Sequence, residues 1–154
     1  MTEYLMDTSS IEEMAAAIRK EFYAFRNGMI ADTLRKGGLE QKYIFGLQLP
    51  QIKDISVRYR PDNEDDCAAL AKLLWNDTEC REARLLACHL MPPDTMTKEE
   101  AQEWAEGILT REEADILAFR LLRHLPFKSE LANYLEGAES ELKKYTATAI
   151  RRFI

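Results

Sequence analysis

The sequence predicts an all-α domain built as a short solenoid, an α-α superhelix of paired antiparallel helices. Apolar residues recur at intervals of three and four in one segment after another, which is typical of amphipathic helices. Helix-starting Ser and Thr residues and helix-ending Gly and Pro residues separate these segments. The second helices of successive pairs recur at about thirty residues, which is a solenoid period. No run of alternating β-branched residues occurs, so no sheet is expected.

The length and composition favour one stable globular domain over residues 1–154. A chain of 154 residues buries roughly 70% of the surface that its unfolded form exposes, so its stability requires neither disulfides nor a metal. Hydrophobic residues make up 46% and charged residues 31%, which argues against a disordered chain. We expect N-terminal helices over residues 1–62, followed by helix pairs over 63–93, 97–126 and 128–154.

The first strong helical pattern lies near the N-terminus. Its apolar stripe consists of Ile11, Met14, Ala15, Ile18, Phe22 and Phe25. Ser9 with Glu12 predicts a capping box at its start, and Gly28 predicts its end. A short helix is expected around residues 29–36. Another helix begins at Pro50, since proline is favoured in the first helical turn.

The middle helix pair has the clearest boundaries. Thr97 with Glu100 and Thr110 with Glu113 predict two capping boxes, one for each helix. Leu117 lies in the central apolar stripe of the second helix, so we expect it to be a core residue.

Cysteine usage and the N-terminal sequence bear on the cellular compartment. The three cysteines, Cys67, Cys80 and Cys88, lack CxxC spacing and fall within helical patterns, which indicates small buried hydrophobic residues in a reducing compartment. The opening segment MTEYLMDTSS lacks the basic and apolar regions of a signal peptide, and no stretch of about 18 apolar residues runs without a charge. We therefore expect a cytoplasmic protein.

Charge is unevenly distributed along the chain. The formal net charge is −6, and residues 61–110 carry four Lys and Arg against twelve Asp and Glu, which disfavours non-specific nucleic-acid binding. Basic residues recur instead on the second helices, which line the concave side of a solenoid. The residues predicted to contact DNA backbone are Arg81, Arg84, Arg120, Arg123, Lys143, Lys144 and Arg151, with Arg152 beside them. Glutamates on the same helices allow the alternative that these cations are simply paired or solvated.

Two stretches of the chain carry a family resemblance. The first is Tyr43-Ile-Phe-Gly-Leu-Gln-Leu-Pro-Gln-Ile-Lys53, and the second is Leu74-Trp75 followed by Glu79-Cys-Arg-Glu-Ala-Arg84. Together they resemble the DNA alkylation repair family, the HEAT-like-repeat glycosylases that remove alkylated purines. The resemblance covers most of residues 10–154 and implies a HEAT-like solenoid. Because both motifs are structural rather than catalytic, they specify the fold more closely than the activity.

The resemblance also implies where a glycosylase site would lie. In the family a Trp-Trp-Asp-x-x-Asp segment follows a Thr on the second helix of a central repeat, and its carboxylate stabilises the developing sugar cation. The matching stretch begins at Thr110, and Glu113 and Ala114 replace the two tryptophans. Asp115 keeps the first aspartate, whereas Ala118 replaces the second, which is the expected catalytic one. Asp115 is the remaining catalytic candidate, although a helix dipole favours a carboxylate there in any case.

Other chemical sites have little support in the sequence. Trp75 and Trp104 could stack on a base, but the helical stripe around Trp104 indicates core packing. His89 and His124 are the only histidines and have no metal-ligand spacing, so no metal is expected. No phosphate-binding glycine motif occurs, and we expect no cofactor.

Three functions remain open at this stage. The first, which we favour, is a degenerate family member, a pseudo-enzyme that still binds duplex DNA backbone. The second is a protein-interaction scaffold that binds a partner helix or peptide in its groove and has no DNA affinity. The third is an active alkylpurine DNA glycosylase. No membrane partner is expected, and Phe153 and Ile154 predict an apolar C-terminal edge that invites a homodimer.

Overall fold

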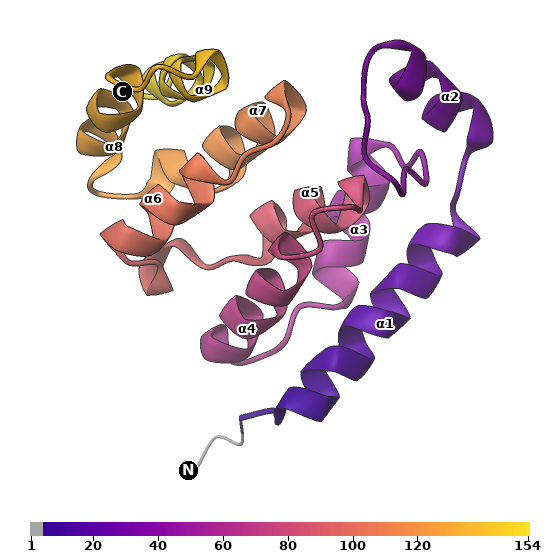
Figure 1. Cartoon of the computed structure of the whole chain (residues 1–154). Helices are drawn as coiled ribbons and strands as arrows, with labels where there is room; N and C mark the ends of the chain where they lie inside the picture. The colour runs from indigo at the N-terminus through magenta and orange to yellow at the C-terminus, as the bar shows by residue number, and fades with distance from the viewer. Residues whose placement is uncertain (1–4) are drawn as a thin grey trace. The chain divides into compact units, whose positions relative to one another are not determined.

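The computed structural model describes residues 5–154, which form two compact units, the first ending at Met91 and the second spanning residues 92–154 (Figure 1). The first unit contains α1 (Thr8–Ala24), α2 (Gly28–Lys36), α3 (Leu49–Arg58), α4 (Glu64–Trp75) and α5 (Arg81–Leu90). The second contains η1 (Pro93–Thr95), α6 (Lys98–Glu106), α7 (Arg111–Arg120), η2 (Leu122–His124), α8 (Lys128–Glu136) and α9 (Glu141–Arg151). Within residues 5–154 there is no β-strand, so the predicted all-α class is confirmed. The expectation of a single domain stays a prediction.

In the first unit, α4 and α5 pack together as a pair, α1 packs on α4, and α3 packs on α5. The core between these helices is formed by fully buried aliphatic and aromatic side chains, among them Ile18, Phe22, Ile52, Leu70 and Leu86. These residues recur at helical spacing on one side of each helix, so the apolar stripes read from the sequence are the buried faces.

In the second unit, the helices expected as the pair 97–126 pack mainly on different partners. α6 packs on α8 and α7 packs on α9, while α8 and α9 pack tightly on each other. First helices therefore pack on first helices and second helices on second helices, which is the stacking of consecutive pairs in a solenoid. Leu117, Leu131, Leu135 and Ile150 are fully or almost fully buried between these helices.

Helix starts agree with the sequence in the middle of the chain and differ at its beginning. Thr97 and Glu100 form the predicted reciprocal capping box of α6. α1, however, is capped by the Asp7 carboxylate, which accepts a hydrogen bond from the Ser10 N–H at 2.8 Å, so the predicted Ser9 cap is wrong. Phe25 falls beyond the end of α1 and is 46% exposed, so it lies outside the core.

The cysteines are buried, as predicted, and none forms a disulfide within the described part of the chain. No helix among residues 5–154 has the length and apolar character needed to cross a membrane.

Replacing Leu117 by Ala should lower the free energy of unfolding by about 2–5 kcal/mol, because its fully buried side chain would leave a cavity. Denaturant titration followed by circular dichroism would measure the loss. Leu109→Ala is a matched control, since Leu109 is 51% exposed in the same unit and should cost less than about 1 kcal/mol. Equal effects of the two substitutions would contradict the assignment of Leu117 to the core.

The native thiols should resist an aromatic disulfide reagent. Burial raises the pKa of the Cys80 thiol to about 11, so at about pH 8 it holds its proton and lacks the reactive thiolate. We expect slow labelling of the folded protein and rapid labelling of all three thiols in denaturant. Rapid reaction of any thiol before unfolding would contradict their burial.

Candidate nucleic-acid interface

Glu82 joins the two family-like stretches inside the first unit. Its fully buried carboxylate accepts hydrogen bonds from the backbone N–H groups of Phe45 at 3.0 Å and Gly46 at 3.1 Å. Arg81 Nη1 lies 2.6 Å from the same carboxylate and donates to the Leu47 carbonyl at 3.0 Å. A buried ion pair is stable only when such hydrogen bonds complete it. This arrangement, the Glu82 clamp, fixes the loop before α3 against the start of α5.

Gly46 fits the Glu82 clamp because it has no side chain. Its φ of +84° lies in the region that favours glycine. A Cβ atom at this position would lie 2.2 Å from the Asn27 carbonyl oxygen and 2.9 Å from the Ala31 nitrogen. The backbone therefore passes too close to the start of α2 for any other residue.

Arg84 holds the second family-like stretch together. Its Nη1 donates to the Trp75 carbonyl at 2.6 Å, and its guanidinium carbon lies 3.5 Å from the centroid of the Trp75 ring. Arg84 is 2% exposed and Arg81 is 4% exposed. Both arginines therefore point into the core, which corrects the expectation that they contact phosphates: neither guanidinium is accessible from solvent.

Asp115 lies on α7 and is engaged by side chains of α9. Its two carboxylate oxygens accept hydrogen bonds from the Tyr145 hydroxyl at 2.9 and 3.0 Å. Arg152 Nη1 lies 3.7 Å from the Asp115 carboxylate. One turn before Asp115, the Arg111 guanidinium lies 4.8 Å from the centroid of the Tyr145 ring. The carboxylate thus has both a hydroxyl donor and a cation as partners.

Beyond Asp115 the same surface carries two phenylalanines and two arginines, which we term the Phe-Arg cluster. The rings of Phe119 and Phe153 have their centroids 5.9 Å apart. The Arg123 guanidinium lies 4.4 Å from the Phe119 centroid and 5.3 Å from the Phe153 centroid. Arg120 lies 5.1 Å from the Phe119 centroid. Each guanidinium is within the range of a cation–π contact.

A change in helix type brings Arg123 to this cluster. Within the range 97–126 expected for one helix pair, α7 ends at Arg120 and the 3₁₀ turn η2 follows it. The tighter turn places residue 123 differently from a continued α-helix.

The other predicted basic residues lie on α9. Arg151 Nη2 donates to Asn133 at 2.7 Å and to the Glu136 carboxylate at 2.6 Å, so its charge is directed to α8. Lys144 Nζ lies 3.8 Å from the Glu141 carboxylate in an exposed pair, which contributes little. Lys143 is partly exposed on the same helix.

Three arginines of this surface, Arg111, Arg120 and Arg123, have aromatic contacts and no carboxylate partner among the described residues. Nearby cations such as Arg151 and Arg152 do lie beside carboxylates. The α7–α9 surface, defined as Arg111, Asp115, Phe119, Arg120 and Arg123 with Tyr145, Lys144, Arg152 and Phe153, is therefore locally cationic.

Sequence reasoning missed Arg111, Phe119 and Tyr145 as members of this surface. Arg111, Asp115 and Phe119 follow one another at intervals of four, which places them along one side of α7. This spacing could have identified the three residues of α7 from the sequence. It gave no indication that α9, which carries Tyr145, packs beside them.

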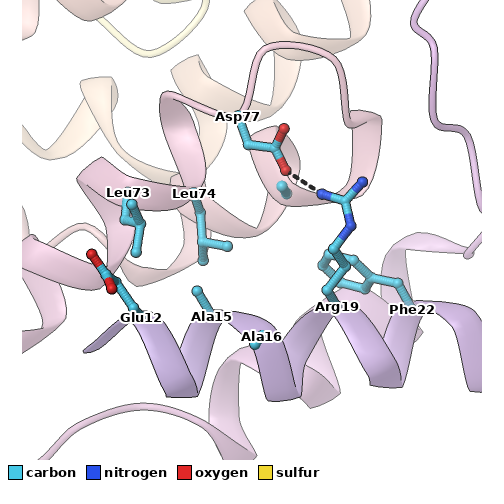
Figure 2. A pocket seen from close by; sticks show the side chains of 9 residues that line it. Glu12, Ala15, Ala16, Arg19, Phe22, Leu73, Leu74 and Asp77 are labelled. Atoms are coloured by element: carbon cyan, nitrogen blue, oxygen red, sulfur yellow. Dashed lines mark hydrogen bonds and ion pairs between the residues drawn. The ribbon is translucent and has the colours of Figure 1, made fainter. Parts of the chain in front are cut away.

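A pocket of about 290 Å³ lies in the first unit between α1 and α4. Figure 2 shows its alanine-lined wall, Ala15 and Ala16, opposite Leu73 and Leu74. At one end Arg19 forms an ion pair with Asp77 at 2.6 Å. Because that cation is already paired, the pocket has no free positive charge for a phosphate. Elsewhere in residues 5–154 no three His, Cys, Asp or Glu side chains gather as metal ligands.

A model of the family described as DNA alkylation repair enzyme matches residues 18–147. The chain belongs to the DNA alkylation repair enzyme family. No curated protein and no solved structure matches it. The matched region contains both stretches joined by the Glu82 clamp, so the family motifs act here as packing elements, as predicted.

The resemblance led us to expect the family's catalytic segment after Thr110, and part of that stretch is buried. Glu113, the residue expected at the first tryptophan position, is 1% exposed and accepts a hydrogen bond from the Leu109 N–H at 2.9 Å. In a capping box the Glu113 carboxylate would accept a hydrogen bond from the Thr110 N–H. Here it accepts one from the preceding residue, Leu109, while the Thr110 hydroxyl caps the Glu113 N–H at 3.1 Å. Ala114 and Ala118 are also buried.

Neither tryptophan of this family member presents a ring for stacking. Trp75 and Trp104 are each 5% exposed, and they are the two tryptophans of the whole sequence. The prediction that Trp104 packs in the core is confirmed.

Replacing Glu82 by Gln should lower the free energy of unfolding by about 3 kcal/mol, because Arg81 would keep a buried charge without its partner. Thermal and denaturant unfolding would measure the effect. Glu79→Gln is a matched control at an exposed position just before α5 and should cost less than about 0.5 kcal/mol. A loss below about 1 kcal/mol in Glu82→Gln would show that the Glu82 clamp is dispensable.

Proposed function

We propose that this family member binds DNA through phosphate contacts of the α7–α9 surface and lacks an intact glycosylase site. The observation that carries the proposal is the group of three arginines, Arg111, Arg120 and Arg123, whose charges have no carboxylate partner among the described residues.

The three arginines suit phosphate binding in both chemistry and spacing. A guanidinium presents a planar set of donors that matches phosphate oxygens, and stacking on a ring orients it before binding. Arg120 and Arg123 both lie against the Phe119 ring, whereas Arg111 lies against Tyr145. Arg111 and Arg120 are separated by a rise of roughly 14 Å along α7 and by about half a turn around it, so the two would contact different phosphates.

The net charge of −6 does not oppose such a local contact, because exposed charges more than about 10 Å apart are screened at physiological salt. Several acids of the second unit are also already engaged. Glu113 is buried, Glu136 pairs with Arg151, and Glu130 pairs with Lys98.

Loss of glycosylase activity is proposed from the residues at the family's catalytic positions. The expected catalytic aspartate is replaced by Ala118, and no exposed tryptophan is present to contact an alkylated nucleotide. Asp115 could contribute only if it gave up its hydrogen bonds from Tyr145.

The double substitution Arg120→Gln and Arg123→Gln should weaken duplex DNA binding. In counterion-release terms each phosphate contact contributes roughly eightfold at 0.1 M salt, so the double variant should lose up to about 60-fold. The slope of log affinity against log salt should fall by about two. Fluorescence anisotropy at several salt concentrations would measure both quantities.

Arg26→Gln with Lys36→Gln is the matched control. It removes two positive charges from the first unit, one of them on an arginine that stacks 4.0 Å from the Tyr23 ring centroid. We expect its DNA affinity to stay within about twofold of the wild type. Equal losses in the two double variants would indicate an unspecific charge effect. An absence of salt-dependent binding would support the alternative of a protein-interaction scaffold.

The same titration tests for glycosylase activity when the duplex carries N7-methylguanine or N3-methyladenine and the samples are assayed for abasic sites. We expect bound DNA without abasic product. Product that disappears in Asp115→Asn would overturn this part of the proposal and make Asp115 the catalytic carboxylate.

A further inference from the structure

The Phe-Arg cluster of the α7–α9 surface is the strongest remaining feature without an assigned role. Phe119 is 40% exposed. Phe153 lies beside it, and Arg120 and Arg123 lie against the rings. We propose that this cluster stacks on unpaired bases, so that the surface binds single-stranded or locally unpaired DNA in preference to intact duplex. This inference rests on the proposed function.

The cluster offers surfaces that fit a base. Phenylalanine rings and guanidinium planes both stack on nucleobases, and such stacking tolerates any sequence because every base has a π-face. A base can lie on the outer face of the Arg123 guanidinium, or it can replace that guanidinium over the ring. In both cases the apolar surface of Phe119 is covered on binding.

Whether a base can stack on the Phe-Arg cluster depends on whether the DNA is paired. In a duplex the bases are stacked on one another inside the helix, and a cluster on a protein surface meets only phosphates and groove edges. In a single strand the base faces are accessible, so stacking adds to the phosphate contacts of Arg111, Arg120 and Arg123. The exposed Phe119 ring, together with arginines that have no carboxylate partner among the described residues, therefore favours the unpaired strand.

A second copy of the chain fits the cluster less well. Ile154, next to Phe153, is 60% exposed, so an apolar C-terminal edge is present, as the sequence predicted. A two-fold dimer on the cluster, however, would place this patch against itself. Arg120 and Arg123 would then lie close to the arginines of the other copy, and the nearby carboxylate of this surface, Asp115, is already engaged by Tyr145 and Arg152. Polyanionic DNA has the complementary charge.

The test compares three oligonucleotides of the same length, about 12 nucleotides. They are a single strand, its duplex, and a single strand in which stable abasic sites replace the central bases. Wild-type protein should bind the base-bearing strand about 10-fold more tightly than the other two. A 2-aminopurine in the single strand should lose fluorescence on binding if it stacks on the cluster.

Phe119→Leu is the informative variant, because it keeps apolar volume and removes the aromatic face. It should reduce single-strand affinity about 5- to 10-fold and reduce duplex affinity by a smaller factor, because the duplex loses only the ring that orients Arg120 and Arg123. Tyr23→Leu is the matched control, since Tyr23 is an exposed aromatic residue (59%) that carries a stacked arginine in the first unit. Its affinity for all three probes should equal that of the wild type.

The other possible outcomes distinguish a failure of base stacking from a failure of DNA binding. Equal affinity for the abasic and base-bearing strands, or an unchanged Phe119→Leu variant, would overturn base stacking and leave phosphate binding intact. Binding to none of the probes would remove the proposed function as well. A monomer–dimer equilibrium in sedimentation that Phe153→Leu abolishes, with no strand preference, would assign the cluster to a second copy of the chain.

Discussion

The buried Glu82 carboxylate organises the first unit. The loop before α3 has no helix of its own to satisfy its backbone N–H groups, and buried N–H groups require partners. Glu82 accepts two of them, and Arg81 balances the charge while it binds the Leu47 carbonyl. Arg84, two residues after Glu82 on α5, ties the end of α4 to the same helix. The family motifs therefore describe a polar framework inside a helical core.

The second unit handles charge in a different way. Three of its arginines, Arg111, Arg120 and Arg123, lie on aromatic rings rather than in buried ion pairs. A guanidinium on a ring keeps most of its donors directed at solvent, so it can bind an anion without first breaking an ion pair. Asp115, by contrast, is already engaged by Tyr145. The α7–α9 surface is thus better suited to hold a polyanion than to stabilise a sugar cation.

Local signals in the sequence predicted the helices, the family and much of the core. The Thr97 cap and the stripe that contains Leu117 depend on residues a few positions apart, and both predictions are confirmed. The role of Arg81 and Arg84 could not be predicted this way. Helical spacing gives the face on which a residue lies, and a charged residue is normally assigned to solvent. Arg81 is stabilised by the adjacent Glu82 and by the Leu47 carbonyl of the preceding loop, and Arg84 by the Trp75 carbonyl at the end of α4. Helical spacing does not reveal these contacts.

The candidate surface was predicted in part for a similar reason. Arg120 and Arg123 were identified from charge alone, while Tyr145 and Phe153 reach α7 only through the packing of α9. Asp115 was singled out by the family register, but its partner thirty positions away could not be read from that register.

The burial of every cysteine has a practical consequence for studying the two units. Since no native thiol is accessible, a cysteine introduced at an exposed position becomes the one site that a thiol-directed probe labels in the folded protein. Lys36 in the first unit and Thr148 in the second are both exposed. A donor and an acceptor dye at these two positions would form a spectroscopic ruler across the chain, able to follow any change in the separation of the units as DNA is added.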